Sequence, residues 1–395
     1  AGTFVTPSLK PGAPIVRVKT SVNLVPAPTS FRPDSILPFQ MGLPALDAFP
    51  RKIWARLGAR CVRAMQPTDM VHPPVYGLPG LRSEIAAYLQ VSRGIDCSPS
   101  QVFVTSGYRH TMELIAHALL KAGDRVWLED PGYPPTRELL AHMHMAVVPV
   151  PVDRDGMIVS EGAKLASRAR AAVVTPGHQS PLCVSLSLPR RLALLDWAAR
   201  QRAWIVEDDY DGEYRYVSRP LPALKSLDRD GRVLYAGTFS KVLFPGIRLA
   251  YLVVPQALVE PFERVSQTLA AGSPQLVQAI VTAFIGEGHF ARHVQRMRRL
   301  YAERREATAA GLEAVLGKRV RIDPQPGGMH LILRLQGRKS DRQLVARMRK
   351  DGLYAEALTD WTMTGEAASA LLLNFTNVDS RGSAENLARR ILKLL

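Results

Sequence analysis

The 395-residue chain has few of the features that mark membrane or secreted proteins. No apolar run approaches the ~20 residues that a membrane-spanning helix needs. The first residues also lack the basic, apolar and small segments of a signal peptide. The three cysteines, Cys61, Cys97 and Cys183, are odd in number and far apart, without the spacing of metal ligands. This usage predicts a reduced, cytoplasmic chain without disulfides, metal or a membrane partner.

Acidic residues are fewer than basic ones, 35 against 51, which gives a formal net charge of +16. Such an excess would suit a polyanionic partner. The basic residues are spread along the chain, however, and clusters such as 296–299 fall on predicted helices. A solvated helix face explains each cluster, so charge alone does not predict a nucleic-acid surface.

The pattern beyond residue 100 predicts an α/β fold. Residues 1–34 are rich in proline and lack a sustained period, as in a linker. Amphipathic helices are expected at 48–65 and 79–90. Seven short runs rich in β-branched residues then alternate mostly with helical segments, and they predict a largely parallel seven-stranded sheet. These runs are 102–104, 125–128, 146–150, 171–174, 203–206, 232–235 and 249–254. Pro149 places the third run at a sheet edge.

The C-terminal part predicts a smaller α+β domain. A long helical region covers 256–316, and helices are expected near 341–351 and 383–394. Strands are expected at 320–322, 329–335 and 371–375. We therefore expect a large domain with its N-terminal segment over 35–300 and a small domain over 301–395. Open parallel sheets bind ligands beyond the C-terminal ends of their strands, where the candidate chemistry falls.

The strongest chemical signal is Lys241, which follows the run 232–235 in the turn Gly237-Thr238-Phe239-Ser240-Lys241. A buried lysine loses its proton readily and can form a Schiff base. Arg248, seven residues later, suits bidentate contact with a phosphate, or a structural ion pair. The hydroxyls of Thr238 and Ser240 suit phosphate too, although both residues also cap turns. A lone lysine is more often a solvated surface residue, so the context carries this prediction.

Further candidates follow other predicted strands. Asp208 and Tyr210 end the run 203–206, where an acid can keep a pyridine nitrogen protonated; the same acidic stretch alternatively fits a metal cluster or a solvated loop. Ser106, Gly107 and Tyr108 begin a predicted helix, and a helix N-terminus binds anions. Tyr133 could stack on a flat ring or fill a turn. His178 could reach a phenolic oxygen or cap a turn.

Taken together, these motifs resemble the class I/II aminotransferases, which are fold type I pyridoxal 5′-phosphate (PLP) enzymes. More closely, they resemble the aminotransferase-like domain of MocR-type bacterial transcription regulators. The resemblance covers about 35–395 and rests on Tyr76–Arg82, Val104–Gly107, Glu129–Pro134, Thr175–Gln179, Ile205–Asp211 and Gly237–Leu249.

The resemblance implies a cofactor and a role for each candidate. PLP would form a Schiff base with Lys241, Asp208 would pair with the pyridine nitrogen, and Tyr133 would stack on the ring. Tyr210 and His178 would lie at the phenolic oxygen. The phosphate would be surrounded by Ser106, Gly107, Tyr108, Thr238, Ser240 and Arg248. The family also implies a homodimer, with each site near the subunit interface.

Several positions depart from the enzymes. Leu372 stands where aminotransferases carry an arginine for the substrate α-carboxylate, so transamination is expected to be weak or absent. Arg137 is a candidate substitute that would contact a substrate or effector. Cys183 stands at a position where the family usually has glycine. His72 stands where the family often has a tyrosine that reaches the phosphate of the partner subunit.

The N-terminus adds an independent clue about the whole protein. Gly2-Thr3-Phe4-Val5 resembles the end of the wing in GntR-type winged helix-turn-helix domains. We therefore expect a linker and an effector domain, preceded in a longer regulator by the domain that binds DNA. PLP or an amino compound would be the effector, in vitamin B6 or amino-compound metabolism. The alternatives are a stand-alone aminotransferase and a binding module without a cofactor.

Overall fold

The computed structural model describes residues 36–215, 222–269, 272–323, 327–337, 339–364 and 368–395. The predicted linker over 1–34, with the wing-like segment Gly2–Val5, lies outside the described residues. Residues Leu37–Leu395 form one compact unit. Within the described ranges, every helix is too short or too polar to cross a lipid bilayer.

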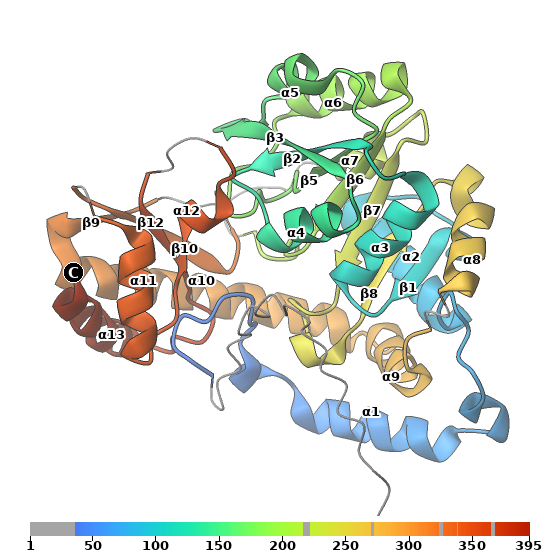
Figure 1. The fold of residues 1–395 in the computed structure, drawn as a ribbon. Helices are drawn as coiled ribbons and strands as arrows, with labels where there is room; N and C mark the ends of the chain where they lie inside the picture. Colours follow the sequence, from blue (N-terminus) through green and yellow to red (C-terminus); the bar gives the residue numbers. More distant parts are fainter. Residues whose placement is uncertain (1–35, 216–221, 270–271, 324–326, 338, 365–367) are drawn as a thin grey trace, which may run out of the picture. The chain divides into compact units, whose positions relative to one another are not determined.

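The larger sheet has the predicted α/β topology (Figure 1). Its strand order is β1-β8-β7-β6-β5-β2-β3-β4. The adjacent strands β3, β2, β5, β6 and β7 pair in parallel, whereas β8 runs antiparallel to both β1 and β7. The strands are β1 (Val102–Thr105), β2 (Arg125–Asp130), β3 (Ala146–Asp153), β4 (Gly156–Met157), β5 (Ala171–Val174), β6 (Trp204–Asp209), β7 (Val233–Thr238) and β8 (Ala250–Val253).

These strands confirm the predicted fold class. The seven predicted strands form, and the two-residue β4 adds an eighth. This extra strand pairs with β3 at Val152 and Asp153, so the outer side of β3 around Pro149 has no described strand beside it. Apolar side chains alternate between the two faces, as Trp127 and Leu128 do in β2, and each face is buried by helices.

Two groups of helices cover the two faces of the sheet (Figure 1). On one face lie α3 (Tyr108–Leu119), α4 (Pro134–His142) and α8 (Val259–Thr268). The other face packs against α5 (Val159–Ala166) and α6 (Leu188–Gln201), and further along against α1 (Arg51–Ala64), α2 (Pro79–Arg93) and α9 (Gln275–Gly286). The short α7 (Leu224–Leu227) follows β6. Sequence patterns did not predict α5 or α7.

The smaller C-terminal sheet is antiparallel throughout, in the order β11-β12-β10-β9. It consists of β9 (Val320–Ile322), β10 (His330–Leu335), β11 (Glu356–Ala357) and β12 (Ala370–Asn374). Its helices are α11 (Asp341–Lys350), α12 (Leu358–Trp361) and α13 (Arg381–Leu394). The core beneath it also contains Phe39, Ala45 and Ala48, so residues from the start of the compact unit pack with the C-terminal sheet.

A single long helix, α10 (His289–Leu316), joins the two sheets. Its first turns bury Phe290 and Val294 in the core beside the large sheet. Its later turns bury Met297, Tyr301 and Leu312 in the core of the small sheet. The domain boundary predicted at residue 300 therefore falls within a continuous helix.

Candidate cofactor site

A cavity of about 340 Å³ lies where the strands β6 and β7 end, and residues of the small sheet close its other side. It brings together most of the residues that the sequence predicted for one site. These are Gly107, Tyr108, Tyr133, Asp208, Tyr210, Thr238, Ser240, Lys241 and Arg248. Three predicted residues, Ser106, His178 and Arg137, do not line this cavity.

Lys241 reaches the cavity from the turn after β7. Its Nζ donates a hydrogen bond to the Gly42 carbonyl at 3.0 Å. Burial lowers the pKa of Lys241, although the carboxylates of Asp211, Glu356 and Asp208 oppose this shift. The close approach requires glycine at position 42, because a Cβ there would lie 2.6 Å from Nζ and the φ angle is +79°. The geometry gives a buried amine that is easily deprotonated, as Schiff-base formation requires.

Asp208 projects to the cavity because side chains alternate along β6. Its neighbour Glu207 points away and accepts hydrogen bonds from the backbone N–H groups of Leu224 and Lys225, at 2.8 and 2.7 Å, at the start of α7. Among the described residues nothing donates a hydrogen bond to the Asp208 carboxylate, which is 8% exposed. Burial and the nearby acids Asp209, Asp211 and Glu129 raise its pKa well above the ordinary value, against the effect of Lys241. A cationic N–H donor in the cavity would satisfy this carboxyl group.

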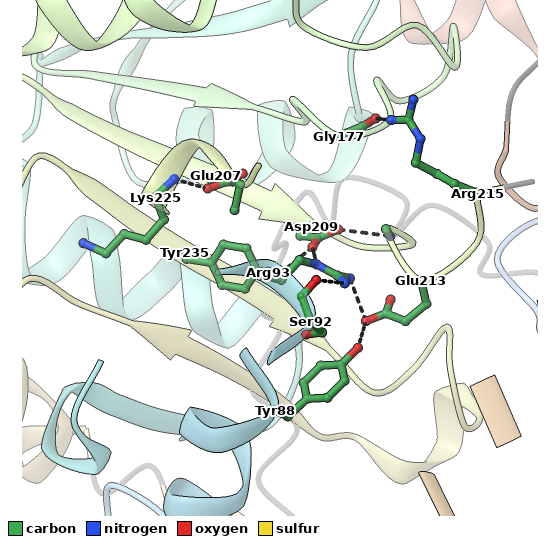
Figure 2. A network of polar contacts seen from close by, with 12 residues as sticks. Tyr88, Ser92, Arg93, Gly177, Glu207, Asp209, Glu213, Arg215, Lys225 and Tyr235 are labelled. Carbon is green, nitrogen blue, oxygen red and sulfur yellow. Dashed lines mark hydrogen bonds and ion pairs between the residues drawn. The ribbon is translucent and has the colours of Figure 1, made fainter. Parts of the chain in front are cut away.

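A buried network of polar contacts surrounds Asp209 at the end of β6 (Figure 2). Arg93 donates from Nε to Asp209 at 2.6 Å and from Nη2 to Glu213 at 2.8 Å. Tyr235 donates to Asp209, and Tyr88 donates to Glu213 at 2.7 Å. Burial alone would raise the pKa of Asp209, but Arg93 and these hydrogen bonds lower it. The acidic stretch is therefore neither a solvated loop nor a cluster open to a metal, since Asp209 and Glu213 already have protein partners.

Groups suited to an anion gather at the N-terminus of α3. Gly107 caps this helix with a φ angle of +120°, and a Cβ there would lie 3.4 Å from the Arg248 guanidinium. Thr238 and Ser240 line the same part of the cavity, and the Ser240 backbone N–H donates to the Thr238 hydroxyl at 3.1 Å. Helix N–H groups, hydroxyls and a guanidinium together suit a phosphate. Ser106 instead contacts His110 Nδ1 through its backbone N–H and its hydroxyl, at 3.0 Å each.

His178 lies behind Tyr210 rather than on the cavity wall. Its Nδ1 is 3.0 Å from the Tyr210 hydroxyl and 3.0 Å from Asp211 Oδ2. Burial works against a charged imidazole, but Asp211 and Cys183 raise the pKa of His178 well above the ordinary value. The imidazole thus lies between Asp211 and the hydroxyl of Tyr210, a residue that lines the cavity.

Aromatic side chains form another part of the wall. The Tyr133 ring lies with its centroid 5.8 Å from Tyr108 and 5.6 Å from Trp361. Tyr133 remains 39% exposed, so one side of its ring is open to a ligand. Arg137, from the same turn and helix, lines a neighbouring cavity of about 20 Å³ with Glu129 and Thr136.

Sequence patterns missed several residues of the wall, which come from segments far from the motifs. They are Met41, Gly42, Met329, His330, Glu356, Trp361 and Asn374. His330 also contacts Cys183, with 3.3 Å between Nε2 and Sγ. The φ angle of Cys183 is +62°, in the left-handed region that favours glycine. This backbone conformation agrees with the glycine that the resemblance implies at this position. Burial opposes the thiolate, but His330 and His178 lower the pKa of Cys183 to about 6.

The resemblance predicted that Leu372 stands in place of a carboxylate-binding arginine. This leucine is fully buried in an apolar cluster with Ile332, Trp361 and Cys183. Nearby, both protons of the Asn374 amide are used, because Nδ2 donates to the carbonyls of Gln40 and Leu43 at 2.8 Å each. Leu372 therefore offers no cation, and the Asn374 amide has no proton left for a ligand.

These features define the class of protein. A sequence profile of the family described as "Aminotransferase class I and II" matches residues 43–382, and the chain belongs to this family. The domain is a PLP-dependent, aminotransferase-like fold, and PLP is the cofactor of the family.

The more specific comparisons point to regulators as well as enzymes. The chain is 37% identical to the probable rhizopine catabolism regulatory protein MocR of Rhizobium meliloti, over 90% of this chain and 71% of that protein. It is 33% identical to the pyridoxine biosynthesis transcriptional regulator PdxR of Corynebacterium glutamicum, over 96% of this chain and 80% of that protein. Against these two and three similar regulators, the chain spans between 56% and 80% of their length.

Among solved structures, the chain is similar to the α-aminoadipate aminotransferase LysN of Thermus thermophilus. The TM-score is 0.82 and the identity 27%, over 91% of this chain and 92% of that one. That enzyme was solved in complex with N-(5′-phosphopyridoxyl)-L-leucine.

The residues around Lys241 fit PLP. The amine of Lys241 suits the aldehyde, and the carboxyl of Asp208, which lacks a described donor, suits a pyridinium N–H. The cradle of Gly107, Ser240 and Arg248 suits the phosphate. These three kinds of group converge on one cavity, as a single small molecule with the same three functions requires.

Proposed function

We propose that this chain is the PLP-binding effector domain of a MocR-type transcription regulator. In this proposal Lys241 holds PLP as a Schiff base, Asp208 pairs with the pyridine nitrogen, and Tyr133 stacks on the ring. Tyr210, supported by His178, bonds the phenolic oxygen. The phosphate lies among Gly107, Tyr108, Thr238, Ser240 and Arg248, with Ser106 at the start of the same turn. When bound, the cofactor supplies a reactive aldehyde that can exchange one amine for another.

The observation that carries the proposal is Leu372. A buried leucine in an apolar cluster cannot pair with an α-carboxylate, so an amino-acid substrate loses the bidentate contact that orients it. Arg137 is the proposed substitute, but it lines the neighbouring small cavity. Because the groups suited to the cofactor remain while this contact is missing, the site favours ligand exchange over turnover.

The regulator role is supported by the identity to MocR and PdxR. An effector can change DNA binding only by favouring one of two conformations, and an amine that exchanges onto PLP could do so by contacting the small sheet. We propose a homodimer in the cytoplasm that binds DNA through an N-terminal winged helix-turn-helix domain. PLP itself or an amino compound would be the effector, in vitamin B6 or amino-compound metabolism.

A stand-alone aminotransferase is the second candidate. It is favoured by the similarity to LysN over nearly the whole length of both chains. In that case Lys241 would also move protons during turnover, and a carboxylate would need another cation, such as Arg109 on the cavity wall.

One experiment separates the two functions. The purified chain is loaded with PLP, and its absorbance is followed while amino acids and amines are added with and without keto acids. An effector domain is expected to give spectral shifts that saturate without sustained product formation. Repeated turnover with any amino-acid and keto-acid pair would instead establish the enzyme. A class I/II aminotransferase with its carboxylate arginine serves as the positive control.

The regulator role needs its own test on the complete gene product. The open reading frame that encodes the chain is expressed in full, and binding to DNA from the flanking intergenic regions is measured with and without PLP. We expect specific, PLP-dependent binding. A full-length product that contains no DNA-binding domain, or that binds no DNA in either state, would contradict the proposal.

A further inference from the structure

The charged groups of the cavity divide into those that the cofactor would use and those that it would not. Lys241, Arg248 and Asp208 suit the aldehyde, phosphate and pyridine nitrogen of PLP. Asp211 is already paired with His178, at 3.0 Å. Glu356 is the remaining carboxylate on the wall, and it faces the cavity from the small sheet. Its charge is therefore available to a ligand other than PLP.

The position of Glu356 in the small sheet indicates which part of a ligand its charge would contact. Glu356 lies in β11 directly opposite Leu372 of the antiparallel neighbour β12. Residues opposite one another in such a pair project from the same face of the sheet. Leu372 is the position where aminotransferases carry the arginine for a substrate carboxylate. By the resemblance, the chain thus has an apolar side chain in place of a cation, directly behind the part of the wall where Glu356 supplies an anion.

Neutral donors hold the Glu356 carboxylate in place. The Tyr354 hydroxyl donates to Oε1 at 2.9 Å, and the Trp361 indole N–H donates to Oε2 at 3.0 Å. No ion pair to Glu356 is found among the residues that the structure describes. The two donors orient the group without neutralising it, and each oxygen keeps a lone pair for a further donor.

The same region offers little to a carboxylate. The Asn374 amide donates both of its protons to the backbone carbonyls of Gln40 and Leu43. Arg109, which also lines the cavity, is 58% exposed and lies 3.8 Å from Glu138. Solvent and that acid weaken its pull on a ligand anion. His330, opposite Asn374, also lines the cavity, but its Nε2 is directed to the Pro181 carbonyl at 2.9 Å and to Cys183 Sγ at 3.3 Å. The groups around Leu372 thus leave few donors free for a carboxylate.

The surrounding rings add to the preference for a cation. Trp361 carries the N–H that binds Glu356, and its ring centroid lies 5.6 Å from that of Tyr133. Aromatic faces attract alkylammonium and guanidinium groups. A carboxylate held by the aromatic residues Tyr354 and Trp361 is a suitable site for the far end of a cationic chain.

We propose that the effector is a primary amine with a second positive charge, such as a diamine or a guanidinoalkylamine, whose distal cation pairs with Glu356. This inference rests on the proposed binding of PLP at Lys241: the first amine would take the place of the Lys241 amine on the cofactor's aldehyde carbon, which releases Lys241 as a free amine, while the second reaches the small sheet. It assigns the chemical class of ligand for the same cavity.

The test compares ligands that differ in the distal group alone. Holo-protein is prepared first, and retention of PLP after dialysis and its borohydride-trapped adduct are verified. Cadaverine, pentylamine and 5-aminopentanoate are then titrated, with agmatine and putrescine to vary the cation and the length. Binding is read from the PLP absorbance shift and from calorimetry. A cationic end is expected to bind about ten- to a hundredfold more tightly than the neutral end, and the carboxylate end more weakly than both.

Two variants locate the selectivity. Glu356→Gln removes the charge but keeps a side chain of the same size, and the advantage of cadaverine over pentylamine is expected to vanish. Asp360→Asn is the matched control, because Asp360 is an exposed acid of the adjacent α12 that pairs with Arg342. In this variant the cadaverine preference is expected to persist.

The outcomes distinguish the inference from the function on which it rests. Failure to retain PLP would reject the proposed cofactor role. Retained PLP with equal affinity for the three ligands, or with tighter binding of 5-aminopentanoate, would overturn the inference alone. So would a cadaverine preference that survives Glu356→Gln.

Discussion

The two walls of the Lys241 cavity are built in different ways. The wall from the large sheet is made of short motifs at the ends of β6 and β7 and at the start of α3, and it has the groups that PLP requires. The described wall residues from the small sheet, including Glu356, Trp361 and Asn374, contain no lysine or arginine. The difference suggests that the grip on the cofactor and the choice of ligand are separable properties of this fold.

The largest effect is expected on the cofactor wall, from Lys241→Ala. Without the amine no Schiff base can form, so the borohydride-reducible PLP adduct should be lost completely. The measurement is mass spectrometry of the reduced protein. Lys225→Ala is a useful control, because Lys225 is a partly buried lysine that donates to the Val233 carbonyl and does not line the cavity. An adduct that persists in Lys241→Ala would reject the assignment.

This wall could be predicted from sequence because its chemistry is local. Lys241 follows a recognisable strand within three residues, and alternation along β6 directs Asp208 to one face and Glu207 to the other. Local patterns did not predict the orientation of side chains that form hydrogen bonds with other protein groups. Ser106 is turned to His110, and His178 is placed behind Tyr210 by Asp211.

The ligand wall could not be predicted in the same way. Glu356 faces the cavity because the two-residue β11 pairs with β12, and such a short strand leaves no period in the sequence. Gly42 reaches Lys241 across 199 positions of the chain. Tertiary contacts between such distant residues leave no local pattern in the sequence. The residues of the ligand wall can therefore be identified only from the folded structure.

The buried network around Arg93 stabilises the strand β6, which carries Asp208 of the cofactor wall. Arg93→Ala leaves the buried acids Asp209 and Glu213 without their cation, which typically costs about 3–5 kcal/mol of unfolding free energy. On the ligand side, Arg342→Ala breaks an exposed pair with Asp360 and should cost less than about 1 kcal/mol. Denaturant unfolding of the two variants makes the comparison. Equal losses of unfolding free energy would show that the buried network stabilises the fold no more than an exposed ion pair does.

The third prediction uses pH to probe the end of β2. Burial raises the pKa of Glu129 from 4.5 to about 7, although hydrogen bonds from Thr175 and Gln179 oppose the shift. The folded state therefore binds the Glu129 proton more tightly than the unfolded chain does. This contribution to stability is present below about pH 4.5 and is lost as the pH rises through about 7.

The difference in unfolding free energy between wild type and Glu129→Gln isolates this contribution. It should fall by roughly 2–3 kcal/mol between the two pH values. The exposed Glu161, paired with Lys164, provides the control variant Glu161→Gln, for which the difference should stay flat. A flat difference for Glu129→Gln would mean that the carboxyl is ionised throughout this range.

The smallest expected effect tests whether the ligand wall can be converted. Leu372→Arg places a guanidinium opposite Glu356, where the two side chains share one face of the sheet. The single variant should gain no affinity for 5-aminopentanoate, because Glu356 pairs with the new cation. The double variant Leu372→Arg with Glu356→Gln frees the guanidinium, and affinity should rise about tenfold, as one charge-assisted hydrogen bond allows. Leu372→Met, of similar volume, controls for repacking of the apolar cluster. If Leu372→Arg alone gained as much as the double variant, Glu356 would not face position 372, and the two walls would not be separable in the way that their geometry indicates.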